Sequence, residues 1–322
     1  MKHFGKVVAL IAGLAASQAA PAWSQQRMTI ATGSSGGVYY LWGGALAKIW
    51  SDNIKNLTVN VEATTGQTVN LKLLEAGQGE LAMSNIAASY EAWTGTGDFK
   101  GREYRKQRAM FAMYPSYYVA AALTDAGINS LEDLNGKRVS FGTPKGTIDV
   151  YGRVMLDVLG IKPARILNSG WPDVAGQIGD KLSDAILVIG GQPWPAVRDL
   201  ETTRSLKFFD LTQAQIDKLH KAYPYFVGEP LPAKLYKNQP ENYNSLAFWN
   251  IMSVSADVSD DIVYQMMDSM VKNFDVIKTT HPSTAAFFKL ADVVRVSPIP
   301  LHPGVIKYLK DKGIDVPKNL IP

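Results

Sequence analysis

The sequence predicts an α/β protein of two lobes, joined by a two-crossing hinge with a central cleft. Short apolar strands alternate with amphipathic helices along the chain, a pattern typical of parallel sheets covered by helices. This alternation starts afresh after residue 123, and a chain of 322 residues is longer than most single domains. Two lobes, each with its own core, are therefore expected.

The first α/β unit contains three strand-then-helix steps. Its expected strands are residues 28–32, 59–63 and 81–84, and its expected helices are residues 42–50 and 69–76. Consecutive strands joined through helices run parallel, so the first unit should hold a parallel sheet.

The second unit follows a long apolar stretch at residues 109–123. Thr212 and Gln215 have the spacing of a capping box, which predicts that a helix begins after Thr212. Its expected strands are residues 139–142, 165–167, 184–189 and 206–209, and its other expected helix is residues 151–159. Prolines and a glycine break the pattern at residues 223–232. Beyond this break, residues 246–254 are expected to form a strand and residues 263–274 a helix, in a final segment that returns to the first lobe.

The hinge is expected where two extended segments connect the units, near residues 112–120 and 222–232. This assigns residues 25–114 and 229–322 to lobe I and residues 115–228 to lobe II. A ligand would then lie between the lobes.

The first 24 residues have the pattern of a secretory signal peptide. Lys2 and Lys6 lie before an apolar run at residues 7–16, and small residues follow the run. Ala22 and Ser24 favour cleavage before Gln25, with cleavage after Ala22 as the alternative. The run is shorter than the roughly 20 residues that span a membrane, so we expect a periplasmic protein released by cleavage.

Composition excludes several classes of function. The 33 basic and 29 acidic residues are scattered, whereas a nucleic-acid-binding protein needs a basic patch. The absence of cysteine excludes disulfides and cysteine nucleophiles. His220, His281 and His302 lack the spacing of metal ligands, so neither a metal nor a cofactor is expected.

Three polar, glycine-rich turns directly follow predicted strands, at residues 33–37, 64–68 and 142–147. Such turns meet at the carboxyl edge of a parallel sheet, and each begins a helix whose free N–H groups favour an anion. Lys145 could complete the binding of a carboxylate. Alternatively, these residues serve only as turn formers and helix caps, with Lys145 in solvent.

Several motifs in order along the chain carry a family resemblance. They are residues 30–40, 43–47, 61–66, 73–77, 112–115, 134–139, 190–193 and 300–304. Together they resemble the TAXI-type solute receptors of TRAP transporters.

The resemblance implies a type II periplasmic binding-protein fold, no catalysis, and a sodium-coupled TRAP permease in the membrane as partner. It also implies a small anionic solute such as glutamate or another carboxylate, bound by a monomer. The chain departs from the family pattern at two places. Lys145-Gly146-Thr147 stands where the family has its usual turn in the second lobe, and Ser84-Asn85-Ile86 stands where the family has an acidic stretch after the third strand. They favour a dicarboxylate or keto-acid over an amino acid.

The expected ligand-binding residues come from these turns, the first crossing and the turns after later strands. Tyr117 and Trp171 have packing as their alternative role. The full set is Ser34, Ser35, Gly36, Gly37, Tyr39, Thr65, Gly66, Gln67, Thr68, Ser84, Asn85, Tyr117, Thr143, Lys145, Gly146, Thr147, Trp171, Gly190 and Gln192.

Two other functions fit parts of the sequence. Residues 33–37 match the Gly-x-Ser-x-Gly nucleophile elbow, which would make Ser35 the nucleophile of an esterase. An elbow normally follows several strands, whereas only one short strand precedes Ser35. A sensory binding module without a permease has the same sequence features as a transport receptor, and the sequence does not separate the two.

Overall fold

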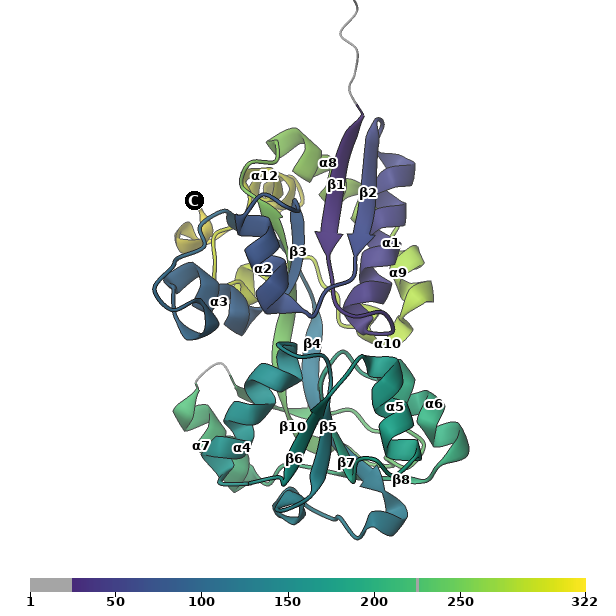
Figure 1. Cartoon of the computed structure of the whole chain (residues 1–322). Helices are drawn as coiled ribbons and strands as arrows, with labels where there is room; N and C mark the ends of the chain where they lie inside the picture. The colour runs from purple at the N-terminus through teal and green to yellow at the C-terminus, as the bar shows by residue number, and fades with distance from the viewer. Residues whose placement is uncertain (1–24, 224–225) are drawn as a thin grey trace, which may run out of the picture.

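The computed structural model describes residues 25–223 and 226–322, which form two lobes stacked one above the other (Figure 1). The predicted signal peptide and its cleavage sites lie outside the described residues. Within the described part, no helix is both long enough and apolar enough to cross a membrane.

The upper lobe in Figure 1 holds the predicted parallel sheet. Strand β1 (Gln26–Ala31) pairs in parallel with β2 (Leu57–Glu62) and with β3 (Leu81–Asn85). Every residue of β3 is buried, as expected for a strand with both faces covered. The strand-then-helix prediction for this unit is confirmed.

Helices from both ends of the chain cover the upper sheet. Trp42, Leu46 and Trp50 are fully buried on the first helix and form the stripe that its periodicity predicts. The upper helices are α1 (Val38–Asn53), α2 (Gln67–Glu75), α3 (Ile86–Thr94), α8 (Asp260–Lys272), α9 (Asp275–Thr280), α10 (Pro282–Ala285), α11 (Asp292–Val296) and α12 (Pro303–Asp311).

Two long antiparallel strands, β4 (Gln107–Leu123) and β10 (Tyr243–Ser255), run through both lobes (Figure 1). Along β4 the buried side chains change from the upper core to the lower core between Tyr114 and Tyr117. Along β10 the same change falls between Phe248 and Ile251.

The ladder between β4 and β10 is irregular at this change of core. Pro115, which has no N–H to donate, pairs with Trp249, and the register shifts just beyond Trp249. The regular ladder is therefore interrupted at the level where the lobes meet, which makes this level a natural hinge.

The second crossing lies later in the chain than the sequence predicted. Residues 222–232 were expected to cross, but β9 (Val227–Leu231) pairs with the lower part of β10. Leu231 and Tyr236 belong to the lower core. We therefore propose that the chain returns to lobe I inside β10, near Trp249, rather than at residue 229.

The lower lobe repeats the α/β pattern. Strand β5 (Arg138–Phe141) runs parallel to β6 (Arg165–Asn168) and β7 (Ala185–Gly190), while β7 and β8 (Leu206–Phe209) pair antiparallel with β4. The lower helices are α4 (Arg153–Leu159), α5 (Trp171–Gly179), α6 (Pro195–Thr203) and α7 (Gln213–Ala222).

The capping box predicted at Thr212 is confirmed. The Thr212 hydroxyl accepts a hydrogen bond from the Gln215 N–H, and the Gln215 side chain accepts one from the Thr212 N–H. The sheet order, β2-β1-β3-β10-β4-β7-β5-β6, places the two parallel units on either side of the long antiparallel pair. This is the predicted two-lobed α/β architecture.

Candidate functional site

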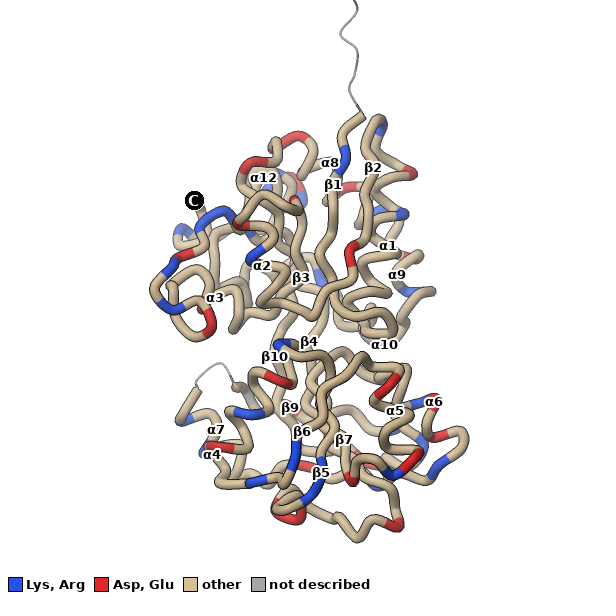
Figure 2. Tube along the Cα trace, viewed as in Figure 1, with Lys and Arg blue, Asp and Glu red and all other residues tan. Residues whose placement is uncertain are grey.

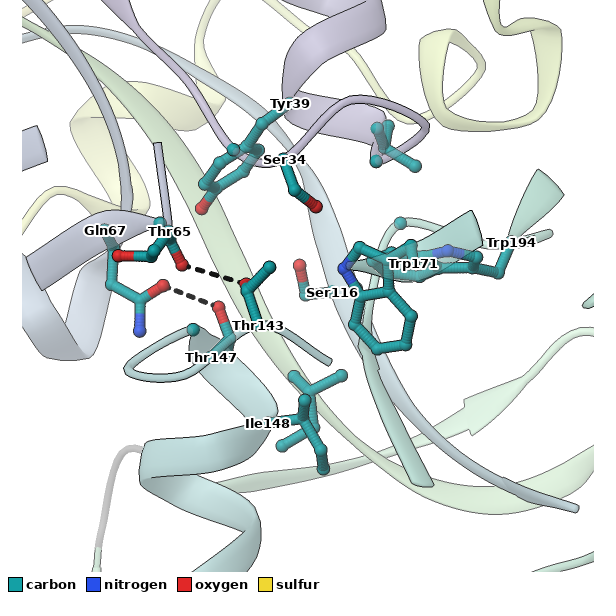
Figure 3. A pocket seen from close by; sticks show the side chains of 18 of the residues that line it. Ser34, Tyr39, Thr65, Gln67, Ser116, Thr143, Thr147, Ile148, Trp171 and Trp194 are labelled. Atoms are coloured by element: carbon teal, nitrogen blue, oxygen red, sulfur yellow. Dashed lines mark hydrogen bonds between the residues drawn. The ribbon is translucent and has the colours of Figure 1, made fainter. Parts of the chain in front are cut away.

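A pocket lies between the lobes, with walls from both (Figure 3). It contains about 490 Å³ of space free of protein atoms, part of it open to solvent. Concave sites where two lobes meet are where proteins commonly bind small molecules. The lining residues are Gly33, Ser34, Gly37, Val38, Tyr39, Thr65, Gly66, Gln67, Tyr114, Ser116, Thr143, Gly146, Thr147, Ile148, Trp171, Ile189, Gly190, Gly191 and Trp194.

The upper wall is built from the two turns that precede α1 and α2. Gly37 is the N-cap of α1, and Gly66, with φ of 124°, is the N-cap of α2. Only glycine adopts this φ readily. Neither cap has a side-chain hydrogen bond, so the first N–H groups of both helices are available beside the pocket.

The lower wall contacts the upper wall through two hydrogen bonds. Thr143 Oγ1 donates to the Thr65 carbonyl oxygen at 3.1 Å, and Thr147 Oγ1 donates to Gln67 Oε1 at 2.8 Å (Figure 3). Gly146 approaches Gly66 closely, since a Cβ on Gly66 would lie 3.4 Å from the Gly146 Cα. The lobes are thus closed over this side of the pocket.

Two tryptophans stand at the opposite end, where Figure 3 shows Trp171 and Trp194 side by side. Their ring centroids are 4.1 Å apart, with 48° between the ring planes. Each ring lies on a glycine at the end of a strand. A Cβ on Gly142 would be 2.2 Å from Trp171 Cζ2, and one on Gly190 would be 1.9 Å from Trp194 Cζ3.

A hydrogen-bonded chain at the hinge includes three residues of the pocket lining. Tyr39 Oη donates to Asn250 Oδ1 at 2.5 Å, and Asn250 Nδ2 donates to Ser116 Oγ at 2.6 Å and to the Tyr114 carbonyl oxygen at 2.8 Å. Burial raises the pKa of the Tyr39 hydroxyl well above its usual value. Tyr39 is therefore neutral, and its proton is already used by Asn250.

The pocket combines polar groups with apolar walls, and none of its nineteen lining residues carries a charged side chain. Three buried polar atoms of the lining, Ser34 Oγ, Gln67 Nε2 and Trp194 Nε1, have no hydrogen-bond partner among the described residues. Two of them can only donate. Helices α1 and α2 begin within this lining and add N–H groups and favourable dipoles. Helices α5 and α6 also begin within or next to it, but proline in the first turn of each removes one N–H donor.

Eleven of the predicted site residues line the pocket. They are Ser34, Gly37, Tyr39, Thr65, Gly66, Gln67, Thr143, Gly146, Thr147, Trp171 and Gly190. All three glycine-rich turns thus converge on one place, together with the turn that carries Trp171.

The other predicted residues of the upper lobe lie outside the lining. Ser35 and Gly36 are exposed at the tip of their turn. The Thr68 hydroxyl faces Asp98, the Ser84 hydroxyl pairs with Ser89, and Asn85 Oδ1 accepts from the Ala88 N–H to cap α3.

Three predicted residues of β4 and the lower lobe also lie outside the lining. Tyr117 is buried against Phe287, and Gln192 donates to the Gly190 carbonyl oxygen and accepts from Tyr236. Lys145 is exposed with φ of 62°, and its N–H donates to Asp149 Oδ2. In this arrangement its side chain does not line the pocket.

Sequence reasoning missed eight lining residues. They are Gly33, Val38, Tyr114, Ser116, Ile148, Ile189, Gly191 and Trp194. Two signals could have found some of them. Trp194 directly follows the motif at residues 190–193, and Tyr114 and Ser116 lie on the first predicted crossing.

The esterase alternative finds no support in the geometry. Ser35 is exposed, and each histidine of the described residues has contacts elsewhere. His220 contacts the Phe226 carbonyl oxygen, His281 contacts Thr284, and His302 contacts the Val258 carbonyl oxygen.

Two α/β lobes closed over a pocket at a two-strand hinge define the periplasmic binding-protein fold, and solved structures agree. Periplasmic binding protein BugD is 12% identical, with a TM-score of 0.54 over 90% of this chain and 99% of that chain. A structure described as a periplasmic transporter is 15% identical, with a TM-score of 0.51 over 78% of this chain and 85% of that chain. The alkanesulfonate-binding protein SsuA from Xanthomonas axonopodis pv. citri, bound to MOPS, is 12% identical, with a TM-score of 0.50 over 89% and 84%.

The chain belongs to the NMT1-like family, whose model matches residues 30–313.

Proposed function

We propose that the chain is a periplasmic solute-binding receptor that captures a small carboxylate and delivers it to a membrane transporter. The observation that carries the proposal is the closed pocket between the lobes, into which the turns before several helices converge. Carboxylates suit such a place because helix N-termini offer free N–H groups and a favourable dipole.

The proposed site consists of the eleven predicted residues that line the pocket, extended by Ser116 and Trp194. The carboxylate would be held at the N-termini of α1 and α2, with Ser34 Oγ and Gln67 Nε2 as further donors. Dicarboxylates, keto-acids and glutamate-like molecules all belong to the class considered.

The partner proposed from the sequence is a sodium-coupled TRAP permease, with the chain as its TAXI-type receptor. Secretion through the N-terminal signal peptide would deliver it to the compartment where such a receptor works. The alternative is a sensory module that binds the same solute without a permease. Transport of the solute in cells that carry or lack the gene for this chain separates the two.

Ligand screening by thermal shift tests the proposal. A solute present at 100 times its dissociation constant should stabilise the protein by about 2.7 kcal/mol. Small-angle scattering then tests closure, because a ligand held between the lobes should shift the population towards the compact form. Failure of every small carboxylate to stabilise the protein would contradict the proposed function.

A further inference from the structure

The charge of the pocket restricts which carboxylates it can hold. Figure 2 shows basic and acidic residues interspersed over both lobes. None of the residues that line the pocket is basic or acidic. The donors there are neutral: the Ser34 hydroxyl, Gln67 Nε2, Trp194 Nε1 and backbone N–H groups. Such donors can solvate one anionic group, but no cation is present to neutralise a second.

Two acidic side chains lie in the first turns of helical segments of the lower lobe. Asp149 lies in the first turn of the helical segment Ile148–Gly152, and Asp173 lies in the first turn of α5. Asp149 is paired with Arg153 at 2.7 Å. Each carboxylate interacts favourably with the positive end of its own helical segment, so less of that positive potential is left for a bound anion.

An amino acid fits the pocket poorly for the opposite reason. Its ammonium group would have to leave water, and the lining contains no Asp or Glu to receive it. Burying a charge without a partner is costly. Among the buried lining atoms without a partner, Gln67 Nε2 and Trp194 Nε1 are donors, which repel an ammonium group.

The remaining wall is apolar and aromatic. Ile148, Ile189 and Val38 line the pocket together with the Trp171 and Trp194 rings, which Figure 3 shows at the end opposite Thr65 and Gln67. Both rings are fixed by packing on glycine. A rigid aromatic wall of this kind favours a hydrocarbon body on the ligand.

We infer that the pocket selects a monoanion, with one carboxylate-like group and an uncharged, largely apolar body, over dicarboxylates and amino acids. This inference rests on the proposed function, because it narrows the ligands of the same site. It also reverses the preference for a dicarboxylate that the sequence suggested through Lys145, since that side chain does not line the pocket.

A panel of five-carbon compounds isolates the effect of charge at constant length. Pentanoate and 2-oxopentanoate carry one negative charge, glutarate and 2-oxoglutarate carry two, and norvaline and glutamate carry an ammonium group. Calorimetry on the full mature chain should give the monoanions at least about tenfold tighter binding than the matched dianions and amino acids. The same comparison between a monoanion and the dianion of equal chain length is then made with compounds of three to eight carbons.

A variant tests the role of the donor separately from that of the ring. Trp194→Phe keeps the aromatic wall but removes Nε1, so the monoanions should bind about three- to tenfold more weakly. Trp93→Phe is the control, because Trp93 lies outside the pocket and contacts Arg105. Its binding should equal that of the parent.

The outcomes separate this inference from the proposed function. Binding of a dianion or an amino acid as tight as that of the matched monoanion overturns the inference, while the carboxylate receptor stands. Binding of no carboxylate at any length overturns both. Unchanged affinity in Trp194→Phe removes Nε1 from the proposed donors and overturns that part of the inference.

Discussion

Thr147 Oγ1 in the lower lobe donates a 2.8 Å hydrogen bond to Gln67 Oε1 in the upper lobe, at one edge of the pocket. Beside it, Thr143 Oγ1 donates to the Thr65 carbonyl oxygen. Both donors lie in the turn that follows β5, and both acceptors lie at the start of α2. These two bonds join the lobes directly in the closed arrangement.

Thr147→Val should weaken ligand binding about two- to tenfold, because it removes the donor and keeps the shape of the side chain. The closed form loses one stabilising hydrogen bond, whereas the open form loses none. Calorimetry with the best ligand from the panel measures the affinity. Small-angle scattering should also show a larger mean radius of gyration without ligand.

Thr124→Val is the matched control for this substitution. Thr124 Oγ1 also donates a hydrogen bond, to the Ser205 carbonyl oxygen at 3.0 Å, but both residues belong to the lower lobe. Equal affinities in the two variants would show that the Thr147 bond does not stabilise the closed form.

Gly190→Ala should abolish tight binding and destabilise the protein by about 1–3 kcal/mol, as in other overpacked cores. The new Cβ would lie 1.9 Å from Trp194 Cζ3, so the ring must leave its place in the pocket wall. Urea denaturation measures the free energy of unfolding, and calorimetry measures the affinity.

Gly44→Ala distinguishes this clash from a general effect of replacing glycine. Gly44 is exposed on α1, and its added Cβ would meet no atom within 4 Å. The control should be stabilised by up to about 1 kcal/mol through helix propensity. A Gly190→Ala variant that binds normally would mean that the position of Trp194 is irrelevant to the ligand.

Lys145→Ala should leave the affinity within about a factor of two, because Lys145 is exposed and outside the pocket lining. The sequence alone predicts a tenfold to hundredfold loss, on the expectation that the ammonium group meets the ligand. Calorimetry decides between these values. Ser34→Ala is the comparison, since Ser34 Oγ lines the pocket without a partner and its loss should weaken binding.

The sequence predicted the sheet and the convergence of its turns well because both follow from local patterns. Strand periodicity located β1 and β3, and the turn glycines follow directly from the ends of their strands. The order of strands in a parallel sheet then brings the turns to one edge. Both predictions therefore rest on local sequence patterns together with one rule of sheet topology.

The sequence failed where a residue's role depends on packing over a long distance. Trp194 reaches the pocket because Gly190 leaves room for its ring, and Ser116 is placed by Asn250, 134 residues away. The sequence also could not show that Lys145 has a positive φ, with its N–H donating to Asp149 and its side chain in solvent. Neither the hydrophobic periodicity nor the spacing of motifs shows the direction in which such a side chain points.

His302 gives the fold a pH dependence of predictable sign. Its Nδ1 accepts a hydrogen bond from the Gly304 N–H at 3.2 Å and so caps α12, while Nε2 lies 3.0 Å from the Val258 carbonyl oxygen. This network assigns the neutral ring with the proton on Nε2. A second proton would remove the cap.

Burial lowers the pKa of His302, and the Asp260 carboxylate, with Oδ1 3.7 Å from Nδ1, opposes this only in part. In the unfolded chain the group titrates near 6.5. As the pH falls below that value, the unfolded state gains a proton that the folded state refuses, so the free energy of unfolding decreases. The loss ends once the pH passes the lower pKa of the folded state.

His302→Asn should flatten this dependence. Asparagine is itself a good N-cap and can accept from the Gly304 N–H, but it does not titrate. Between pH 7 and pH 5, the free energy of unfolding should therefore fall less in the variant than in the parent, by up to about 1.4 kcal/mol per pH unit. Urea denaturation at half-unit intervals provides both curves. Burial also lowers the pKa of His281, but this contribution is common to both proteins and cancels in their difference.

Parallel curves for parent and variant would show that His302 has the same pKa folded and unfolded, and that its buried cap does not oppose protonation.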